Sequence, residues 1–270
     1  MRFASRAATV LAVAVSMGWP LRALADESQW LPAPEGIDAA ALAQQAEDTW
    51  RSDTTYMEAT MTIESPRLPA PRVVRFRSWD DRPGGRAFIR ILSPAKDAGT
   101  GFLKQKLNLW MYVPRVERTV RIPPSLMLQP WMGSDFTNDD LVRESSGPED
   151  YQHAVLGIDP GTGEGEAYVL EYRPREDAPV VWDRIVAWLD REHLTPLRQD
   201  FYDEAGDVVR QMRFGEISLE QGRWFPHRWS MESLDRPGHA TRIEIEEVRF
   251  DADADDSIYT TQRLQRALRP

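Results

Sequence analysis

The chain has 270 residues, no cysteine and a formal net charge of −10 at neutral pH. Without cysteines there is no disulfide framework, so stability has to come from a buried core, to which the nine tryptophans beyond residue 25 can contribute large apolar areas. The acidic balance argues against a nucleic-acid partner and against electrostatic docking on anionic lipid head groups.

Residues 1–25 have the pattern of a cleaved secretory signal peptide. Arg2 and Arg6 give a positive start, Ala7–Trp19 form an apolar stretch, and Ala23–Ala25 supply the small-x-small cleavage signal. The stretch is shorter than the roughly 20 residues that a membrane-spanning helix needs. No cysteine follows it that could be acylated. We therefore expect an exported, non-lipidated mature protein that forms one domain over residues 26–270.

A helix is expected near the start of the mature chain. Asp38 is a suitable N-cap, and the helix should run to about Ser52. Leu42, Ala46 and Trp50 recur at one-turn spacing and should share a buried face.

Strand-like segments follow from Thr54 to Phe250, separated by turns that contain glycine. In the first segment the apolar side chains alternate with polar ones, which is typical of a strand with one buried face. Such segments, recurring roughly every ten residues, indicate an antiparallel sheet or barrel. We expect about eleven strands, a short helical turn at Thr137–Leu141 and a closing helix at Ser257–Leu268.

The central stretch combines three predicted strands with an apolar segment. The strands are Gly101–Gln105, Leu109–Val113 and Val116–Ile122, and Pro123-Pro124 ends the third because proline lacks the N–H that a ladder needs. Ser125–Met132 is rich in Leu and Met and too irregular for a strand. It fits a mobile flap over an apolar groove or a segment that simply folds onto the core, and the residues alone leave both open.

The same stretch resembles a known family. The matching motifs are Phe88–Ala95 followed by Gly99-x-Gly101, then Phe102-Leu103, Leu109–Pro114, Arg118-x-x-Arg121-Ile122-Pro123-Pro124-Ser125, and Met132–Phe136 with Asp140-Leu141. Together they resemble the signature of the periplasmic outer-membrane lipoprotein-sorting family, which is similar to the LolA/LolB-type lipoprotein carriers. The resemblance implies a strongly curved antiparallel sheet, an open half-barrel, whose helices act as a lid over an acyl-chain cavity. It also implies a periplasmic location.

The residues predicted to form the binding site follow from this combination. The apolar groove and flap would consist of large or flexible side chains: Met57, Met61, Phe76, Phe88, Phe102, Trp110, Tyr112, Leu126, Met127, Leu128, Trp131 and Met132. Similar side chains recur later at Met212, Phe214, Trp229 and Met231. A latch between flap and sheet would pair Arg118 and Arg121 with Asp135, Asp139 or Asp140, although an ordinary surface salt bridge fits these residues equally well. Alternation alone does not distinguish an open groove from a filled core.

Other chemistry finds little support in the sequence. The four histidines are scattered singly, and the acidic run Asp251–Asp256 lacks the glycine and the closing glutamate of a calcium loop. Gly133-Ser134-Asp135 is the one candidate for a nucleophile, but it is not the G-x-S-x-G turn and fits a helix cap better. We therefore expect no catalytic residues, metal or cofactor.

The residues and the resemblance together predict a carrier for an acylated lipoprotein or a free lipid, acting as a monomer. An inner-membrane transporter and an outer-membrane acceptor are candidate partners. Two other interpretations stay open: an accessory periplasmic subunit of an envelope exporter that binds a protein or another apolar ligand, and an ester hydrolase that uses Ser134.

Overall fold

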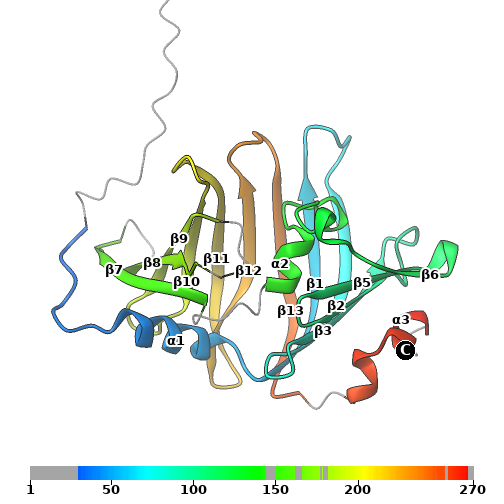
Figure 1. The fold of residues 1–270 in the computed structure, drawn as a ribbon, viewed down its shortest axis with the longest axis horizontal. Helices are drawn as coiled ribbons and strands as arrows, with labels where there is room; N and C mark the ends of the chain where they lie inside the picture. The colour runs from blue at the N-terminus through cyan, green and yellow to red at the C-terminus, as the bar shows by residue number, and fades with distance from the viewer. Residues whose placement is uncertain are drawn as a thin grey trace, which may run out of the picture.

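Thirteen strands form one antiparallel sheet in the part of the chain that the computed structural model describes, residues 30–143, 150–161, 166–176, 178, 182–252 and 255–266. The expected mainly β fold with an open, curved antiparallel sheet is confirmed, and the sheet is not closed into a barrel (Figure 1). The expected number of about eleven strands was two too low. The predicted signal peptide, residues 1–25, lies outside the described residues.

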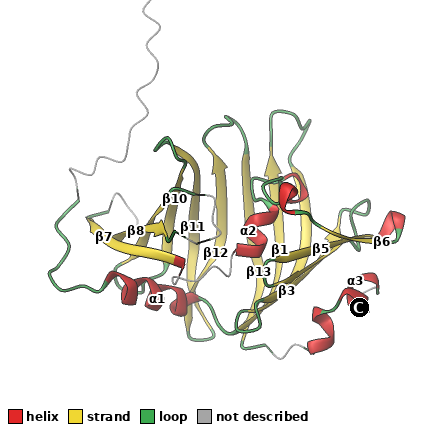
Figure 2. Cartoon of the chain, in the orientation of Figure 1, coloured by secondary structure: helices red, strands yellow, loops and turns green. Residues whose placement is uncertain are grey.

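The strands are, in chain order, β1 (Thr54–Glu64), β2 (Arg72–Asp81), β3 (Arg86–Ser93), β4 (Gly101–Gln105), β5 (Asn108–Val113), β6 (Arg118–Arg121), β7 (Tyr151–Asp159), β8 (Ala167–Pro174), β9 (Arg184–Asp190), β10 (Pro196–Tyr202), β11 (Val208–Glu220), β12 (Arg223–Ser233) and β13 (Ala240–Phe250). The helices are α1 (Ala39–Trp50), α2 (Asn138–Arg143) and α3 (Thr261–Gln265), with short 3₁₀ turns η2 (Pro114–Val116), η3 (Pro124–Leu126), η4 (Trp131–Gly133) and η6 (Asp256–Tyr259). Figure 2 shows how few these helices are beside the sheet.

The order of the strands explains how two runs of hairpins make one sheet. The order is β6-β5-β4-β3-β2-β1-β13-β12-β11-β10-β9-β8-β7, so strands are neighbours in sequence everywhere except at the centre. There β1 pairs with β13, the last strand, in antiparallel register from Thr55 opposite Phe250 to Glu64 opposite Ala240. The two ends of the sheet, β6 and β7, therefore come from the middle of the chain.

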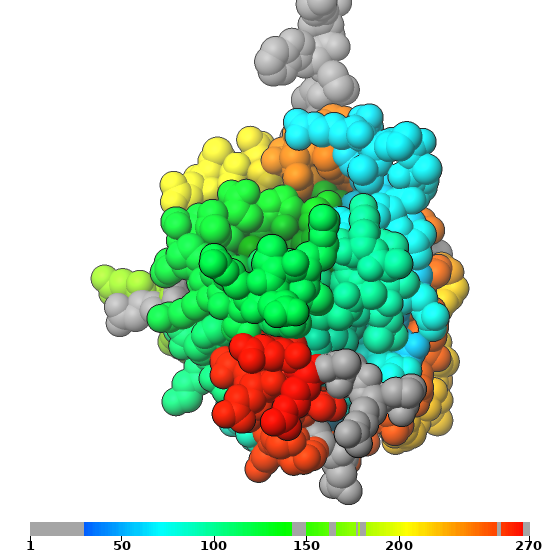
Figure 3. All heavy atoms as spheres, turned by 90° about the vertical axis from the view of Figure 1, so that its right-hand side faces the viewer, coloured from blue at the N-terminus to red at the C-terminus, as the bar shows by residue number. Residues whose placement is uncertain are grey.

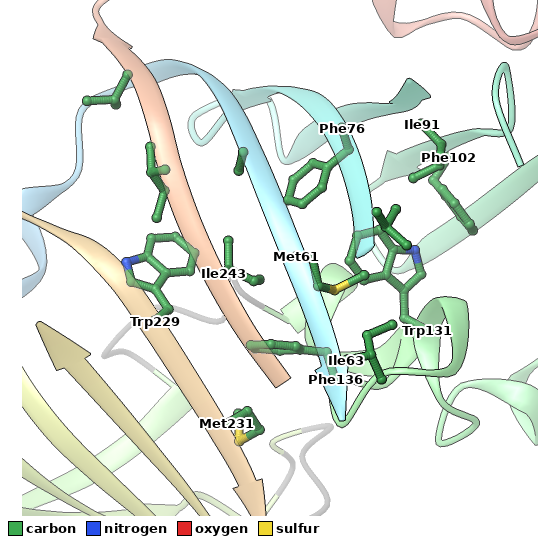
Figure 4. Packing of buried hydrophobic residues seen from close by; sticks show 14 of the residues in the cluster. Met61, Ile63, Phe76, Ile91, Phe102, Trp131, Phe136, Trp229, Met231 and Ile243 are labelled. Atoms are coloured by element: carbon green, nitrogen blue, oxygen red, sulfur yellow. The ribbon is translucent and has the colours of Figure 1, made fainter. Parts of the chain in front are cut away.

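The inner face of the sheet carries the main hydrophobic core. Because side chains alternate along a strand, Ala59, Met61 and Ile63 of β1 all point to this face and are almost fully buried. Figure 4 shows Met61 and Ile63 beside side chains from β2, β12 and β13, among them Phe76 and Trp229. The alternation predicted for the first strand is thus confirmed.

The outer face is covered near both ends of the sheet. Trp30 packs edge-on against Trp188 of β9, and Leu31 forms a bridge with Ile158 of β7. At the other end, η6 and α3 cover β3 to β5 and bury Phe88 and Leu103. Figure 3 shows these C-terminal residues, in red, against the neighbouring strands. Strands near the two ends, such as β4 and β9, therefore carry buried residues on both faces, whereas the edge strand β6 is largely exposed.

Helix α1 begins where the sequence predicts. The Asp38 carboxylate accepts hydrogen bonds from the backbone N–H groups of Ala40 and Ala41, at 3.0 and 3.1 Å, which is the N-cap arrangement. Leu42 and Ala46 face the sheet as predicted. The helix contacts β7 and β12, so it crosses the inner side of the curved sheet (Figure 1).

Two predicted boundaries need correction. The strand predicted from Val116 begins at Arg118, because Pro114–Val116 form a 3₁₀ turn that leaves Glu117 with a left-handed backbone. The helix predicted for Ser257–Leu268 is split into η6 and α3 at Thr260, whose hydroxyl caps the second piece. No helix in the described ranges is long and apolar enough to cross a membrane.

A candidate ligand-binding cavity

A cavity of about 290 Å³ lies between the inner face of the sheet and the two segments that cover it. One cover is α1. The other is residues 122–143, which leave β6, include η3, η4 and α2, and are called the lid loop below. The walls are mostly aromatic and aliphatic side chains, and those on the sheet include Met57, Ala59, Phe76, Ile89, Ile185, Phe201, Met212, Phe214, Trp229, Met231, Ile243 and Ile245. A mostly apolar, covered cavity of this kind is suited to an apolar ligand.

Trp131 is the largest lid-loop side chain in the cavity wall. Its side chain is 2 % exposed, and its ring meets those of Phe76 and Phe102 edge-on, with ring centroids 5.7 Å apart in both pairs. Figure 4 shows the indole beside Phe76 and Phe102, above Ile63 and Phe136. Phe136 enters the core from the other side of the same turn and is also buried. The lid loop is thus fixed to the sheet by aromatic packing.

The lid loop has a defined shape because its backbone is hydrogen-bonded to itself. The Trp131 N–H donates to the Phe136 carbonyl at 2.7 Å, and the Asp139 N–H donates to the Met127 carbonyl at 2.8 Å. The Asn138 side chain donates to the carbonyl of Leu126 at 3.0 Å. These bonds give the loop a defined backbone conformation over the cavity. They take the place of strand pairing, to which its prolines cannot donate because proline lacks a backbone N–H.

Asp135 holds the lid loop to the ends of β12 and β13. Its carboxylate accepts hydrogen bonds from the hydroxyls of Ser233 at 2.7 Å and Thr241 at 2.8 Å, and from Arg236 at 3.1 Å. Its N–H donates to the Thr241 hydroxyl at 2.9 Å. The carboxylate is almost fully buried, so these partners offset the cost of removing it from water.

The latch therefore uses other arginines than those predicted. Asp135 is paired with Arg236, and Asp140 with Arg210 at 2.9 Å. Arg121 donates to the side chain of Asn108 in β5, and Arg118 is exposed on the edge strand. The pairing was mispredicted because the true partners lie 70 and 101 residues further along the chain, and only the position of β11 to β13 beside the loop brings them together.

The structure brings some of the predicted groove residues together and separates others. Met57, Phe76 and Trp131 line the cavity. Met61 and Phe102 belong to the same buried core beside it. The other three, Phe88, Trp110 and Tyr112, pack on the outer face under the C-terminal segment, and we leave them out of the proposed site.

The flap residues differ in the same way. Met127 and Met132 are partly buried against the core, whereas Leu126 and Leu128 are 46 % and 55 % exposed. Neither leucine lines the cavity. The lid loop thus presents its two methionines and Trp131 inward and the two leucines outward.

Several wall residues were not predicted. Ala43 and Ala46 come from α1, whose helical face was recognised but not linked to a ligand, and Trp182 and Phe201 come from the β9–β10 region. Pro196–Tyr202 gave no signal for Phe201, because it contains three consecutive polar residues and does not alternate. The family resemblance implies helices as a lid over the cavity, but helical periodicity alone does not place α1 there.

Charged side chains gather where α1 and α2 meet the cavity. Glu47 and Arg51 of α1 form an ion pair at 2.7 Å, and Arg51 lies 3.7 Å from Asp80 of β2. Asp139 and Asp140 line the cavity from α2. Burial raises the pKa of Tyr172, which also lines the cavity, above the ordinary value of a phenol.

The candidate nucleophile has a structural role in the loop. The Ser134 hydroxyl is buried, donates to the Trp131 carbonyl at 2.7 Å and accepts from the Phe136 N–H at 3.2 Å. These bonds close the turn between η4 and α2. Across the described residues, no group of three or more His, Asp and Glu side chains is placed to hold a metal ion.

Comparison with known proteins identifies a matching family model and solved structures with a similar fold. A protein-family model with the description "Uncharacterized protein" matches residues 84–266. A search of curated proteins found no match.

Three solved structures are similar over most of the chain. A DUF1329 family protein from Desulfovibrio piger is 24% identical, with a TM-score of 0.77 over 83% of this chain and 97% of that one. A domain named for outer membrane lipoprotein sorting, from Vibrio parahaemolyticus, is 23% identical, with a TM-score of 0.73 over 84% and 98%. A LolA superfamily protein from Nitrosomonas europaea is 20% identical, with a TM-score of 0.69 over 84% and 99%. At these identities the likeness establishes a shared fold.

Proposed function

Because the chain belongs to the family whose model matches residues 84–266, and has the fold of outer membrane lipoprotein-sorting and LolA superfamily proteins, we propose that it is a periplasmic carrier. In this role it shields the acyl chains of a lipoprotein or a lipid during transfer towards the outer membrane. The cavity between the sheet, α1 and the lid loop carries this proposal. An inner-membrane donor and an outer-membrane acceptor are the partners that such a role requires.

The energetics explain why a covered cavity is needed. Burying one CH₂ group is worth roughly 0.8 kcal/mol, so an acyl chain of about 16 carbons represents on the order of 12 kcal/mol of apolar transfer. A carrier has to compensate most of this cost and still release the chain. Methionine side chains in the wall, such as Met57, Met212 and Met231, adapt to chains of different shape without tight matching.

We propose no bond chemistry for this protein. The bonds of the Ser134 hydroxyl to the backbone of its own turn support a structural role. If Ser134 is not a nucleophile, the wild type and a Ser134→Ala variant will hydrolyse a short-chain ester at the same rate, or neither will hydrolyse it. Loss of a measurable wild-type esterase activity in that variant would contradict the proposal.

The test of the carrier role is to fill the cavity. Ala46 lies on α1, is 3 % exposed and lines the cavity, whereas Ala41 lies on an exposed part of the same helix. An Ala46→Phe substitution should abolish uptake of a fluorescent acyl probe by the mature protein, because the ring occupies the space of the chain. Ala41→Phe adds the same ring outside the cavity and should bind like the wild type. Equal binding by both variants would place the acyl chain elsewhere.

A further inference from the structure

Ser78 is a polar residue in an otherwise apolar part of the cavity wall. It lies on β2 opposite Met57 of β1 and Ile89 of β3, and both of these neighbours line the cavity too. Residues directly opposite each other share a face of the sheet, so Ser78 points inward. The residue is 7 % exposed, and its hydroxyl has no hydrogen-bond partner among the described residues.

Trp131 is the second wall residue with this property. Its indole N–H is buried and has no partner within the described ranges. Phe76, whose ring meets Trp131, is two residues from Ser78 on the same face of β2. Almost all buried polar groups in proteins are hydrogen-bonded, and an unpaired one costs roughly 1–3 kcal/mol. Of these two, the Ser78 hydroxyl is the unpaired donor on the cavity face of β2, and it points to a ligand that supplies an acceptor.

The charges around the cavity decide what kind of acceptor fits. Three carboxylates line it, those of Glu47, Asp139 and Asp140, against the one guanidinium of Arg51. Arg51 is paired with Glu47, and the nearby Arg210 is paired with Asp140. An anionic ligand group would lose its water beside these carboxylates. The nearby guanidinium groups of Arg51 and Arg210 are already paired with carboxylates and would not compensate this cost. The acceptor should thus be uncharged.

We propose that the cavity selects uncharged acyl esters over free fatty acids of the same length, and that the Ser78 hydroxyl donates a hydrogen bond to the ester carbonyl. This inference rests on the proposed carrier function and adds a substrate class to it. In the complex, the carbonyl lies at the Ser78 end of the cavity, and the hydrocarbon extends towards Trp229 and Met231.

The experiment compares three C12 ligands in displacing a neutral fluorescent probe, N-phenyl-1-naphthylamine, from the mature protein at pH 8. Methyl laurate has the carbonyl without charge, laurate has the charge, and dodecane has neither. We expect methyl laurate to bind at least about tenfold more tightly than laurate. In a Ser78→Ala variant its affinity should fall about three- to tenfold, while that of dodecane stays unchanged, because only the ester uses the hydroxyl.

Two further variants keep the result interpretable. Ser78→Thr retains the hydroxyl and should restore the ester affinity. Ser230→Ala removes a hydroxyl from the opposite face of β12, and it should leave all three ligands unaffected. The inference is overturned if laurate binds as tightly as the ester, or if Ser78→Ala weakens dodecane as much as methyl laurate. If neither the probe nor any C12 ligand binds, the carrier function itself fails, and this inference fails with it.

Discussion

Asp135 and Thr241 exchange two hydrogen bonds, one in each direction. The Thr241 hydroxyl donates to the Asp135 carboxylate at 2.8 Å and accepts from the Asp135 N–H at 2.9 Å. This pair, with Ser233 and Arg236, fixes the lid loop above the cavity. Since the contact joins the loop to β13, the position of the lid depends on the centre of the sheet.

An Asp135→Ala substitution should therefore loosen the lid. It leaves the buried hydroxyls of Ser233 and Thr241 without their acceptor, which should lower the free energy of unfolding by about 2 kcal/mol. Urea unfolding followed by tryptophan fluorescence measures this loss. Asp235→Ala, which removes a neighbouring carboxylate that is mostly exposed, is the control and should cost less than about 0.5 kcal/mol. Equal stabilities of the two variants would show that the Asp135 contacts do not hold the loop.

Trp131 lies on the inward side of the lid loop and Leu126 on its outward side. Trp131→Ala removes a buried ring from the cavity wall and should cost about 3–5 kcal/mol as well as weaken acyl binding. Leu126→Asp changes an exposed side chain and should alter neither stability nor binding. Thermal unfolding and probe titration test both. Loss of binding in Leu126→Asp would mean that the lid moves enough to bring this leucine inside.

Arg90 holds the C-terminal segment on the outer face. Its buried guanidinium donates to the carbonyls of Leu264 at 2.9 Å and Arg263 at 3.0 Å, and also bonds the carbonyl of Gly99. Burial, with some repulsion from Arg263, lowers the pKa of Arg90 to about 10, so it stays charged at neutral pH. This depressed pKa gives no pH dependence of stability below about pH 9, because the group is protonated in both the folded and unfolded states there.

Arg90→Met should release η6 and α3 without unfolding the sheet. Hydrogen exchange should then become faster in residues 256–266, because their carbonyls lose a shared donor. Arg115→Met removes an exposed guanidinium from η2 and serves as the control. Unchanged exchange in the Arg90 variant would mean that the apolar contacts of Leu264 and Tyr259 hold the segment alone.

A cross-strand ion pair on the outer face should give a measurable pH dependence. Arg77 donates to Glu58 at 2.8 Å, and this hydrogen bond lowers the pKa of Glu58 below its ordinary value of 4.5. A depressed folded-state pKa means that the stabilisation is present above pH 4.5 and is lost as the pH falls through the folded value. Glu58→Gln should therefore be less stable than the wild type at pH 7 by up to about 1 kcal/mol, and this difference should shrink as the pH falls below 4.5. Urea titrations at several pH values decide this, and a stability difference that does not change with pH would assign the effect to packing.

Local patterns predicted the strands well, but not which face each large side chain occupies. Along β3, Phe88 is buried under α3, while Ile89 and Ile91 face the inner core. Because both faces are covered there, apolar residues occur at successive positions, and alternation gives no preferred face. Phe88 and Trp110 were placed in the groove for that reason. In β1, where the outer face is polar, the prediction was correct.

Local sequence patterns could not predict polar contacts between residues that are far apart in the chain. The partners of Asp135 are separated from it by 98 to 106 positions in sequence. Ser78 has no sequence signal either, since a serine in a strand is ordinary. Its position between Met57 and Ile89 becomes meaningful only when the register of β1, β2 and β3 is known.

Native mass spectrometry of the mature protein, residues 26–270, purified from periplasm without detergent, tests the carrier role most directly. We expect a bound species of several hundred daltons that fragments as an esterified acyl lipid, and that is absent from the Ala46→Phe variant. A wild-type protein that carries no such species and takes up no fluorescent acyl probe would contradict the carrier role and favour a protein partner instead.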